Sequence, residues 1–258
     1  MVLIFLIGFI GSFLSGMLGI GGAIIHYPMM LYLPPLLGFA AYSAHDVTGM
    51  VATQVFFTTM TGMLVYRKGG YLNKSLVLYM GTGIFAGSFL GGYSSKLLSE
   101  TWIHLIYTIL AGIAVWMMFM TTKESDETPV SQVTFHPIPV MGTAFIVGIF
   151  SGVIGASGSY ILVPIMLAVF KIPTRVTIAT SLAVAFISSV GSGAAKFASD
   201  QIFLIPSIIL VISSLIASPL GAMIGKKTNP QTLRIGLSIL IAITFIKIWF
   251  DYLALYKG

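Results

Sequence analysis

Long apolar stretches recur along the whole chain and alternate with short polar or glycine-rich ones. We predict ten apolar helical segments, five in each half: 2–18, 22–38, 46–66, 75–96 and 102–121, then 138–154, 158–170, 176–197, 203–225 and 235–252. A helix needs about 20 apolar residues to cross a hydrocarbon core of about 30 Å, and most of these segments approach that length. The pattern therefore predicts an all-α polytopic membrane protein.

Composition supports a lipid environment for most of the chain. Of the 258 residues, 57% are hydrophobic and only 8% are charged, which is more apolar surface than a soluble core of this size can hide. The polar stretch from Thr121 to Gln132 is the only plausible linker between the halves. We therefore predict a first transmembrane repeat at 1–121, a cytoplasmic linker at 122–137 and a second repeat at 138–258.

The two halves carry the same glycine-punctuated segment. Residues 16–31 (GMLGIGGAIIHYPMML) and 152–167 (GVIGASGSYILVPIML) align at an offset of 136, with seven of sixteen positions identical. The first two segments of each half together hold about 35 residues, and a helix of about 50 Å would be too long for one span. We expect each half to bend at the glycines, as a helical hairpin or as a helix followed by a shorter half-helix.

These breaks are the candidate binding site. Backbone that is not helical survives at membrane depth only where it is buried in protein or lines a wet cavity, and the start of the resumed helix offers free N–H donors to an anion. The alternative is that the glycines only permit tight helix packing. The candidate residues are Gly19, Gly21 and Gly22 in the first break, and Gly155, Ser157, Gly158 and Ser159 in the second.

The third segment of each half is repeated as well, at an offset of 131. In the second copy, hydroxyl residues recur at one helix face, at 177, 181, 188 and 192, and such a stripe either lines a polar path or joins helices by hydrogen bonds. The path is our preferred interpretation, because the stripe follows a break in both halves. The candidates on these segments are Thr48, Gln54, Thr180 and Ser181.

Positive charge predicts the orientation, since cytoplasmic loops carry an excess of Lys and Arg. With the segments threaded alternately, an odd number of crossings in each half places equivalent loops on opposite sides, so the repeats are predicted to be inverted. Both termini then lie outside the cytoplasm. The basic residues expected inside are Arg67, Lys68, Lys74, Lys123, Lys171, Arg175, Lys226, Lys227 and Arg234, against Lys96, Lys196, Lys247 and Lys257 outside.

Two ionisable residues in the apolar segments are further candidates. Lys196 ends the hydroxyl-rich segment and forms an i, i+4 pair with Asp200 at a predicted outer helix end, where snorkelling to the surface is the alternative to substrate contact. His26 lies four residues past the first break, either as a neutral side chain satisfied by a neighbour or in a proton-sensing or anion-contacting role. Export of an anion from a negative interior gains about 2.3 kcal/mol per charge per 100 mV, so it could run without a coupling ion.

At these residues the chain resembles the sulfite exporter TauE/SafE family of membrane transporters. The resemblance rests on the two breaks followed by proline (GMLGIGGAIIHYP and GVIGASGSYILVP) and on the two following segments, of which ATSLAVAFISSVGSGAAKF is the more typical. It implies export of small sulfur-containing or organic anions of the sulfite, sulfonate or sulfoacetate class. The first copy departs from the usual pattern at Thr48-Gly49 and His26, and the second at Ser157. No cofactor is implied, and the expected partners are a small anion and the lipid bilayer, without nucleic acid, in a monomer or a homodimer.

Two rival functions remain open from the sequence. An anion channel would use the same place with a different mechanism. Gly155-Ala156-Ser157-Gly158 also matches the GxSG setting of rhomboid-type intramembrane serine proteases, which would need a histidine base within reach of Ser157. The matching break has Gly21 at that position, so a duplicated structural element explains the motif better, and we expect no enzyme activity.

Overall fold

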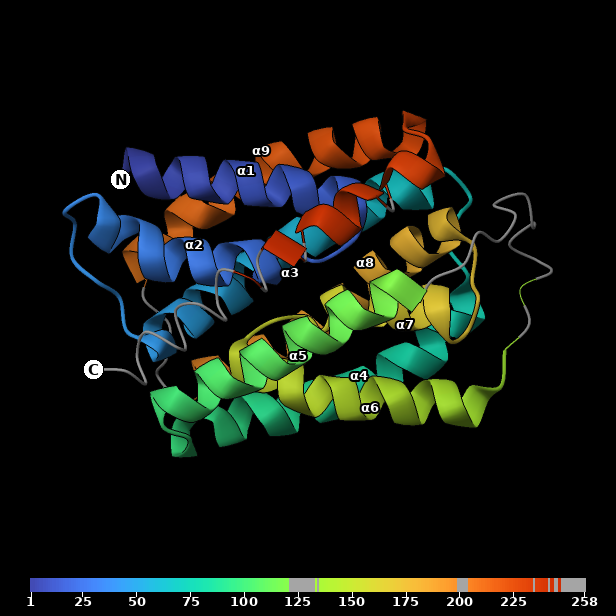
Figure 1. Ribbon diagram of the computed structural model, residues 1–258, viewed down its shortest axis with the longest axis horizontal. Coiled ribbons are helices and arrows are strands. Elements are labelled where there is room, and N and C mark those ends of the chain that lie inside the picture. Colours follow the sequence, from blue (N-terminus) through green and yellow to red (C-terminus); the bar gives the residue numbers. More distant parts are fainter. Residues whose placement is uncertain are drawn as a thin grey trace.

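The computed structural model describes residues 1–120, 133, 135–198, 204–233, 235–240, 242–243 and 246. Most of the predicted linker at 122–137 therefore lies outside the described residues, as do Asp200 and the C-terminal residues from 247. The described part is all-α, as predicted, and holds no strand. Its elements are α1 Val2–Leu18, α2 Ala23–Leu36, α3 Ala44–Arg67, α4 Lys74–Ser94, the short 3-10 helix η1 Ser95–Leu97, α5 Glu100–Met120, α6 Pro137–Ile154, α7 Ser159–Ala168, α8 Thr174–Phe197 and α9 Leu204–Lys227 (Figure 1).

Six helices of the described chain are long and apolar enough to cross a membrane: α3, α4 extended by η1, α5, α6, α8 and α9. Their outward faces carry large apolar side chains, such as Phe85 and Phe89 on α4 and Ile208 and Ile212 on α9, which suits contact with lipid. In contrast, α2 has 14 residues and α7 has 10, so they are about 21 and 15 Å long and reach only part of the way across the hydrocarbon core.

Each short helix runs back along the helix before it. A Cβ atom placed on Gly22 would touch Ser15 of α1, and one placed on Gly11 would touch the ring of His26, so α2 lies antiparallel to α1. The same relation holds in the second half, where Gly158 lies against Ser151 of α6. Of the two arrangements predicted for the breaks, the helical hairpin is therefore the one that the structure adopts.

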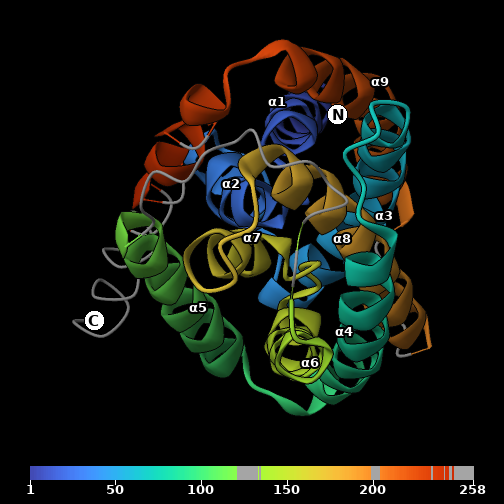
Figure 2. The same cartoon turned by 90° about the vertical axis from the view of Figure 1, so that its right-hand side faces the viewer.

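The two halves are interleaved. α1 packs on α9 and α6 packs on α4, so the first helix of each half contacts the fourth helix of the other half. Glycine allows both contacts to be close: Gly16 of α1 lies against the carbonyl of Ser218, and Gly152 of α6 against the carbonyl of Ser88. α3 packs on α8, and viewed along the helices α2 and α7 lie in the centre of the bundle with the longer helices around them (Figure 2).

Basic residues of the second half meet the end of α3 and the loop after it at one end of the bundle. Arg175, at the start of α8, donates to the carbonyls of Lys226 and Thr228, and its guanidinium lies over the ring of Tyr71, 5.6 Å from the centroid. Lys226 Nζ also donates to the carbonyl of Val65 at 3.4 Å. The loop after α3, the loop before α8 and the end of α9 thus share one end. α7 ends at this same end, shortly before α8 begins. α2 ends at the opposite end, shortly before α3 begins. The two hairpins therefore open toward opposite ends of the bundle.

Candidate functional site

The backbone of both breaks is left-handed at the same two matched glycines, whereas the breaks differ at Gly21, which is left-handed, and its counterpart Ser157, which is not. Gly19 ends α1 with φ +76° and Gly22 begins α2 with φ +83°, while Gly155 ends α6 with φ +73° and Gly158 begins α7 with φ +67°. This left-handed region is costly for residues with a Cβ atom, which explains why glycine stands at both matched positions. The repeated sequence therefore encodes a repeated turn.

The two breaks touch each other. Gly21 has φ +70°, and a Cβ atom there would collide with Ser157 Oγ and Ser159 Oγ of the second break. These two hydroxyl oxygens are 2.9 Å apart and hydrogen-bonded. Gly21 precedes α2 by two residues and Ser157 precedes α7 by two residues, so the amino ends of both short helices converge on this contact. The first N–H groups of each helix have no intrahelical partner there.

Each break is also fixed to the third helix of the other half. In the first break, the carbonyl of Gly19 accepts a hydrogen bond from Ser181 Oγ of α8 at 2.8 Å, and the Gly19 Cα faces Ile178. In the second break, Gly155 lies against the carbonyl of Thr48 on α3. The predicted residues Thr48 and Ser181 therefore contact the breaks, each across the interface between the halves.

Lys196 is buried behind the second break. Its side chain is 0% exposed, and Nζ donates to Thr48 Oγ1 at 3.0 Å, Ser95 Oγ at 3.2 Å and the carbonyl of Val153 at 3.3 Å. Val153 is in the last turn of α6, where carbonyls lose their intrahelical donors and a cation is favourable. The expectation that Lys196 snorkels to the outer surface is wrong, because these three acceptors hold it inside the protein.

His26 and Gln54 form a separate polar cluster with Ser12 and Thr58, all of them 0% exposed. His26 Nδ1 lies 2.7 Å from the carbonyl of Gly22, which can only accept, so this nitrogen carries hydrogen. The Gln54 amide then donates to His26 Nε2 and, at 2.8 Å, to Ser12 Oγ, which lies 3.2 Å from Thr58 Oγ1. Both predicted residues are thus in one network, which surrounds the start of α2.

Thr180 is buried, and its Oγ1 has no hydrogen-bond partner in the described part of the chain. The hydroxyl stripe on α8 divides between roles: Thr177 Oγ1 donates to the carbonyl of Ile172 and Ser181 to Gly19, whereas Ser192 packs beside Gly92 of α4. Ser181 therefore connects α8 to the first break, and a polar path along the stripe stays a prediction.

Sequence reasoning missed two tyrosines that support the breaks. Pro28 has no N–H, so the carbonyl of Ile24 loses its intrahelical donor, and Tyr107 of α5 supplies one at 2.8 Å. Tyr66 of α3 donates to the carbonyl of Met17 at 3.2 Å, in the last turn of α1. The proline signals that some donor is needed at Ile24, but only the fold identifies which residue provides it.

The contacts of Ser157 do not resemble a serine protease. Among the described residues, Ser157 Oγ bonds to Ser159, and the ring nitrogens of His26 face Gly22, Gly8 and Gln54. A serine protease needs a histidine base that is hydrogen-bonded to the serine hydroxyl, and His26 does not occupy this position relative to Ser157.

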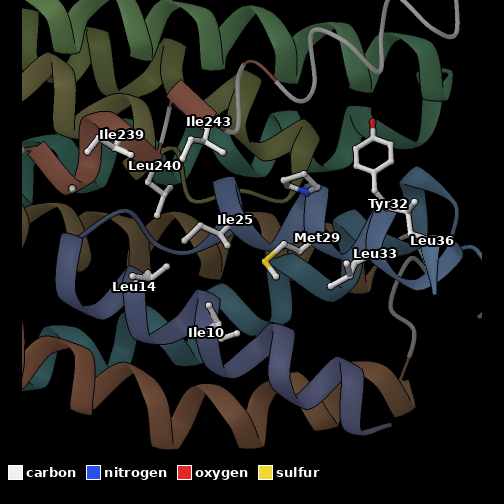
Figure 3. A pocket seen from close by; sticks show the side chains of 12 residues that line it. Ile10, Leu14, Ile25, Met29, Tyr32, Leu33, Leu36, Ile239, Leu240 and Ile243 are labelled. Carbon is white, nitrogen blue, oxygen red and sulfur yellow. The ribbon is translucent and has the colours of Figure 1, made fainter.

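A pocket of about 500 Å³ lies beside the first hairpin but does not reach the contact between the breaks. Side chains from α1, from α2 and from Ile239, Leu240 and Ile243 line it (Figure 3). Its lining is almost entirely apolar, with Ile10, Leu14, Ile25 and Met29 among the residues, so it does not suit a small anion. The break residues themselves are buried.

Several membrane-spanning helices around two broken hairpins, whose helix starts meet inside the bundle, define a multi-pass membrane protein of the transporter class. The chain belongs to the sulfite exporter TauE/SafE family, whose profile matches residues 4–248. It is 24% identical over 262 residues to the probable membrane transporter protein YunE of Bacillus subtilis, covering 93% of this chain and 94% of that one. A probable membrane transporter protein of Methanocaldococcus jannaschii is 23% identical over 252 residues, covering 93% and 92%. No solved structure matches this chain.

Proposed function

We propose that this protein exports small sulfur-containing or organic anions, of the sulfite, sulfonate or sulfoacetate class, across the plasma membrane. The observation that carries the proposal is the contact of Gly21 with Ser157 and Ser159, because it brings the amino ends of two half-helices together inside a membrane bundle. An oxyanion can accept hydrogen bonds from the free N–H groups and from the two hydroxyls. The family to which the chain belongs supports the choice of anion.

Lys196 supplies positive charge beside these neutral donors. It bonds to Thr48, whose carbonyl lies against Gly155, and to the carbonyl of Val153 in the last turn of α6. An ionisable residue buried at membrane depth is a candidate functional group, and the positive charge of a lysine attracts an anion nearby. We assign the anion-binding role to the break residues and Lys196, with Thr48, Thr180 and Ser181 close to the route.

The way the hairpins are held supports alternating access as the proposed mechanism. The break residues are buried against α3 and α8, so an anion would reach them when one hairpin moves relative to these helices. The hairpins open toward opposite ends, and movement of one at a time would expose the contact between the breaks to one side and then to the other. The cluster around Arg175 supports a cytoplasmic location for that end, with inverted repeats and both termini outside.

The test is anion flux in proteoliposomes that contain the full chain. We expect saturable uptake of sulfite or a sulfonate, faster when the opposite side holds unlabelled anion. Ser157→Ala should reduce uptake about tenfold or more, which corresponds to loss of about 1.4 kcal/mol of binding or barrier energy. Ser189→Ala is the matched control, because Ser189 is a buried serine whose hydroxyl bonds within its own helix, to Phe186.

An anion channel is the second candidate, and the same vesicles distinguish it. A carrier shows saturation and counter-flow, whereas a channel shows ohmic single-channel steps in a planar bilayer. Equal flux of wild type and Ser157→Ala would refute the proposed site. No flux of any tested sulfur anion would refute the proposed substrate class.

A further inference from the structure

One hydrogen-bond acceptor in the polar cluster around His26 has no donor among the described residues. Gln54 Oε1 is buried and has no hydrogen-bond partner among the described residues, while the nitrogen of the same amide donates to Ser12 and His26. An unused buried acceptor costs free energy, so its retention beside an imidazole needs a physical reason.

A second proton on the imidazole would use that acceptor. In the present arrangement Nδ1 carries hydrogen, because it faces the carbonyl of Gly22, and Nε2 accepts from the Gln54 amide. If Nε2 binds a proton, it becomes a donor, and a half-turn of the Gln54 amide places Oε1 against it. The carbonyl of Gly8, 3.4 Å from Nε2, is a second acceptor on the same side of the ring. The cluster can therefore satisfy the imidazolium form as well as the neutral one.

The surroundings leave the charge of such a proton unbalanced. His26 is faced by Gly8, Gly11 and Ser12 of α1, by Gln54 of α3 and by Gly22 at the start of its own helix, and none of these described groups is titratable. The neighbouring Tyr27 points away, toward Tyr107 and His104 of α5. A proton on His26 thus needs a negative charge from elsewhere to be stable in this buried place.

The anion site proposed above is the adjacent place for that charge. The carbonyl that accepts from His26 Nδ1 belongs to Gly22, the residue after Gly21, and Gly21 touches the hydroxyls of Ser157 and Ser159. The positions that correspond to His26 and Gln54 in the second half are Leu162 and Ala185, so the described chain has one such cluster.

We infer that His26 binds one proton at Nε2 together with each singly charged anion, and that proton and anion cross the membrane together. The proton bonds to the imidazole on the side from which the anion enters, Gln54 turns its carbonyl oxygen to it, and both are released on the other side. The inference rests on the proposed function, and it replaces a potential-driven anion movement with an electroneutral one.

The experiment measures anion and proton movement in the same proteoliposomes. Methanesulfonate is the anion, because it stays fully ionised and carries no proton itself. A pH-sensitive dye inside the vesicles reports protons, and potassium with valinomycin sets the potential. For the wild type we expect one proton per methanesulfonate and a final accumulation that ignores a potential of about 100 mV, which would change the accumulation of an uncoupled anion about fiftyfold.

His26→Gln removes the proton-binding nitrogen and keeps a polar side chain. We expect its slower methanesulfonate flux to carry no protons and to follow the potential, whereas His104→Gln, a histidine on α5, should keep the wild-type ratio of protons to anions. The wild-type measurement of potential dependence needs no variant, so the inference is testable even if His26→Gln does not fold. Wild-type flux that follows the potential and moves no protons would overturn the inference and leave anion export standing. Absence of flux for every tested anion would instead remove the proposed function, and the inference with it.

Discussion

Tyr66 and Lys196 perform the same task at equivalent places in the two halves. Tyr66 donates to the carbonyl of Met17 and Lys196 to that of Val153, and these two carbonyls are 136 residues apart, the offset of the repeated break. Both lie in the last turn of a helix that the break interrupts. One half therefore closes its broken helix with a neutral phenol and the other with an amine, so the halves are alike in architecture and different in charge.

The exchange of Lys196 for methionine tests this difference. Lys196→Met leaves the carbonyl of Val153 without its donor, and an unsatisfied buried acceptor costs about 1–3 kcal/mol. Tyr66→Phe removes the corresponding donor in the other half at a similar cost. We expect both variants to lower the melting temperature in detergent, but only Lys196→Met to reduce anion flux about tenfold or more, because only Lys196 adds charge to the proposed site. Equal losses of flux would show that Lys196 acts through stability alone.

Gly21→Ala tests the contact between the breaks. The new Cβ atom meets two obstacles, a backbone with φ +70° and the hydroxyls of Ser157 and Ser159. Gly38 is the matched control, since it has φ +78° and open space around it, so Gly38→Ala isolates the backbone strain of about 1–2 kcal/mol. We expect Gly21→Ala to destabilise the protein clearly more than Gly38→Ala does.

The double variant Gly21→Ala with Ser157→Gly completes the cycle, since it removes one of the two colliding hydroxyls. Melting temperatures of the four proteins measure the coupling, and we expect the Gly21→Ala cost to shrink in the Ser157→Gly background. Strictly additive effects would mean that the two breaks are not in contact.

The repeat at an offset of 136 predicted the position of both breaks. The boundaries of the described helices follow the predicted apolar segments within a few residues, because local apolar composition determines where a membrane helix begins and ends. The burial of the Lys196 side chain could not be predicted from local composition. Its spacing to Asp200 is typical of a solvated helix end, and only the packing of α8 against α3 and α4 turns it inward. Ser12 gave no signal at all, since its partner Gln54 is 42 residues away. Local patterns thus predicted the elements, and contacts distant in sequence decided the site.

Tyr107 and Pro28 should be energetically coupled. The proline leaves the carbonyl of Ile24 without an N–H donor, and the Tyr107 hydroxyl replaces that donor at 2.8 Å. Tyr107→Phe should therefore cost about 1–3 kcal/mol in the wild-type background. In a Pro28→Ala background the restored N–H can bond to Ile24, and the same change should cost less than about 1 kcal/mol. Melting temperatures or denaturant titrations of the four proteins give the coupling, and an unchanged cost in both backgrounds would contradict it.

The inverted arrangement can be tested directly, because the natural chain has no cysteine to remove. Phe39 follows α2 and Val169 follows α7, and their side chains are 60% and 58% exposed. These are equivalent loops of the two halves, so inversion places them on opposite sides of the membrane. In intact cells we expect a membrane-impermeant maleimide to label Phe39→Cys and not Val169→Cys, and in inside-out vesicles the reverse, because the proposed orientation puts the Val169 end in the cytoplasm. Labelling of both variants from one side would rule out inversion, whereas labelling from opposite sides in the exchanged order would keep inversion and reverse the orientation.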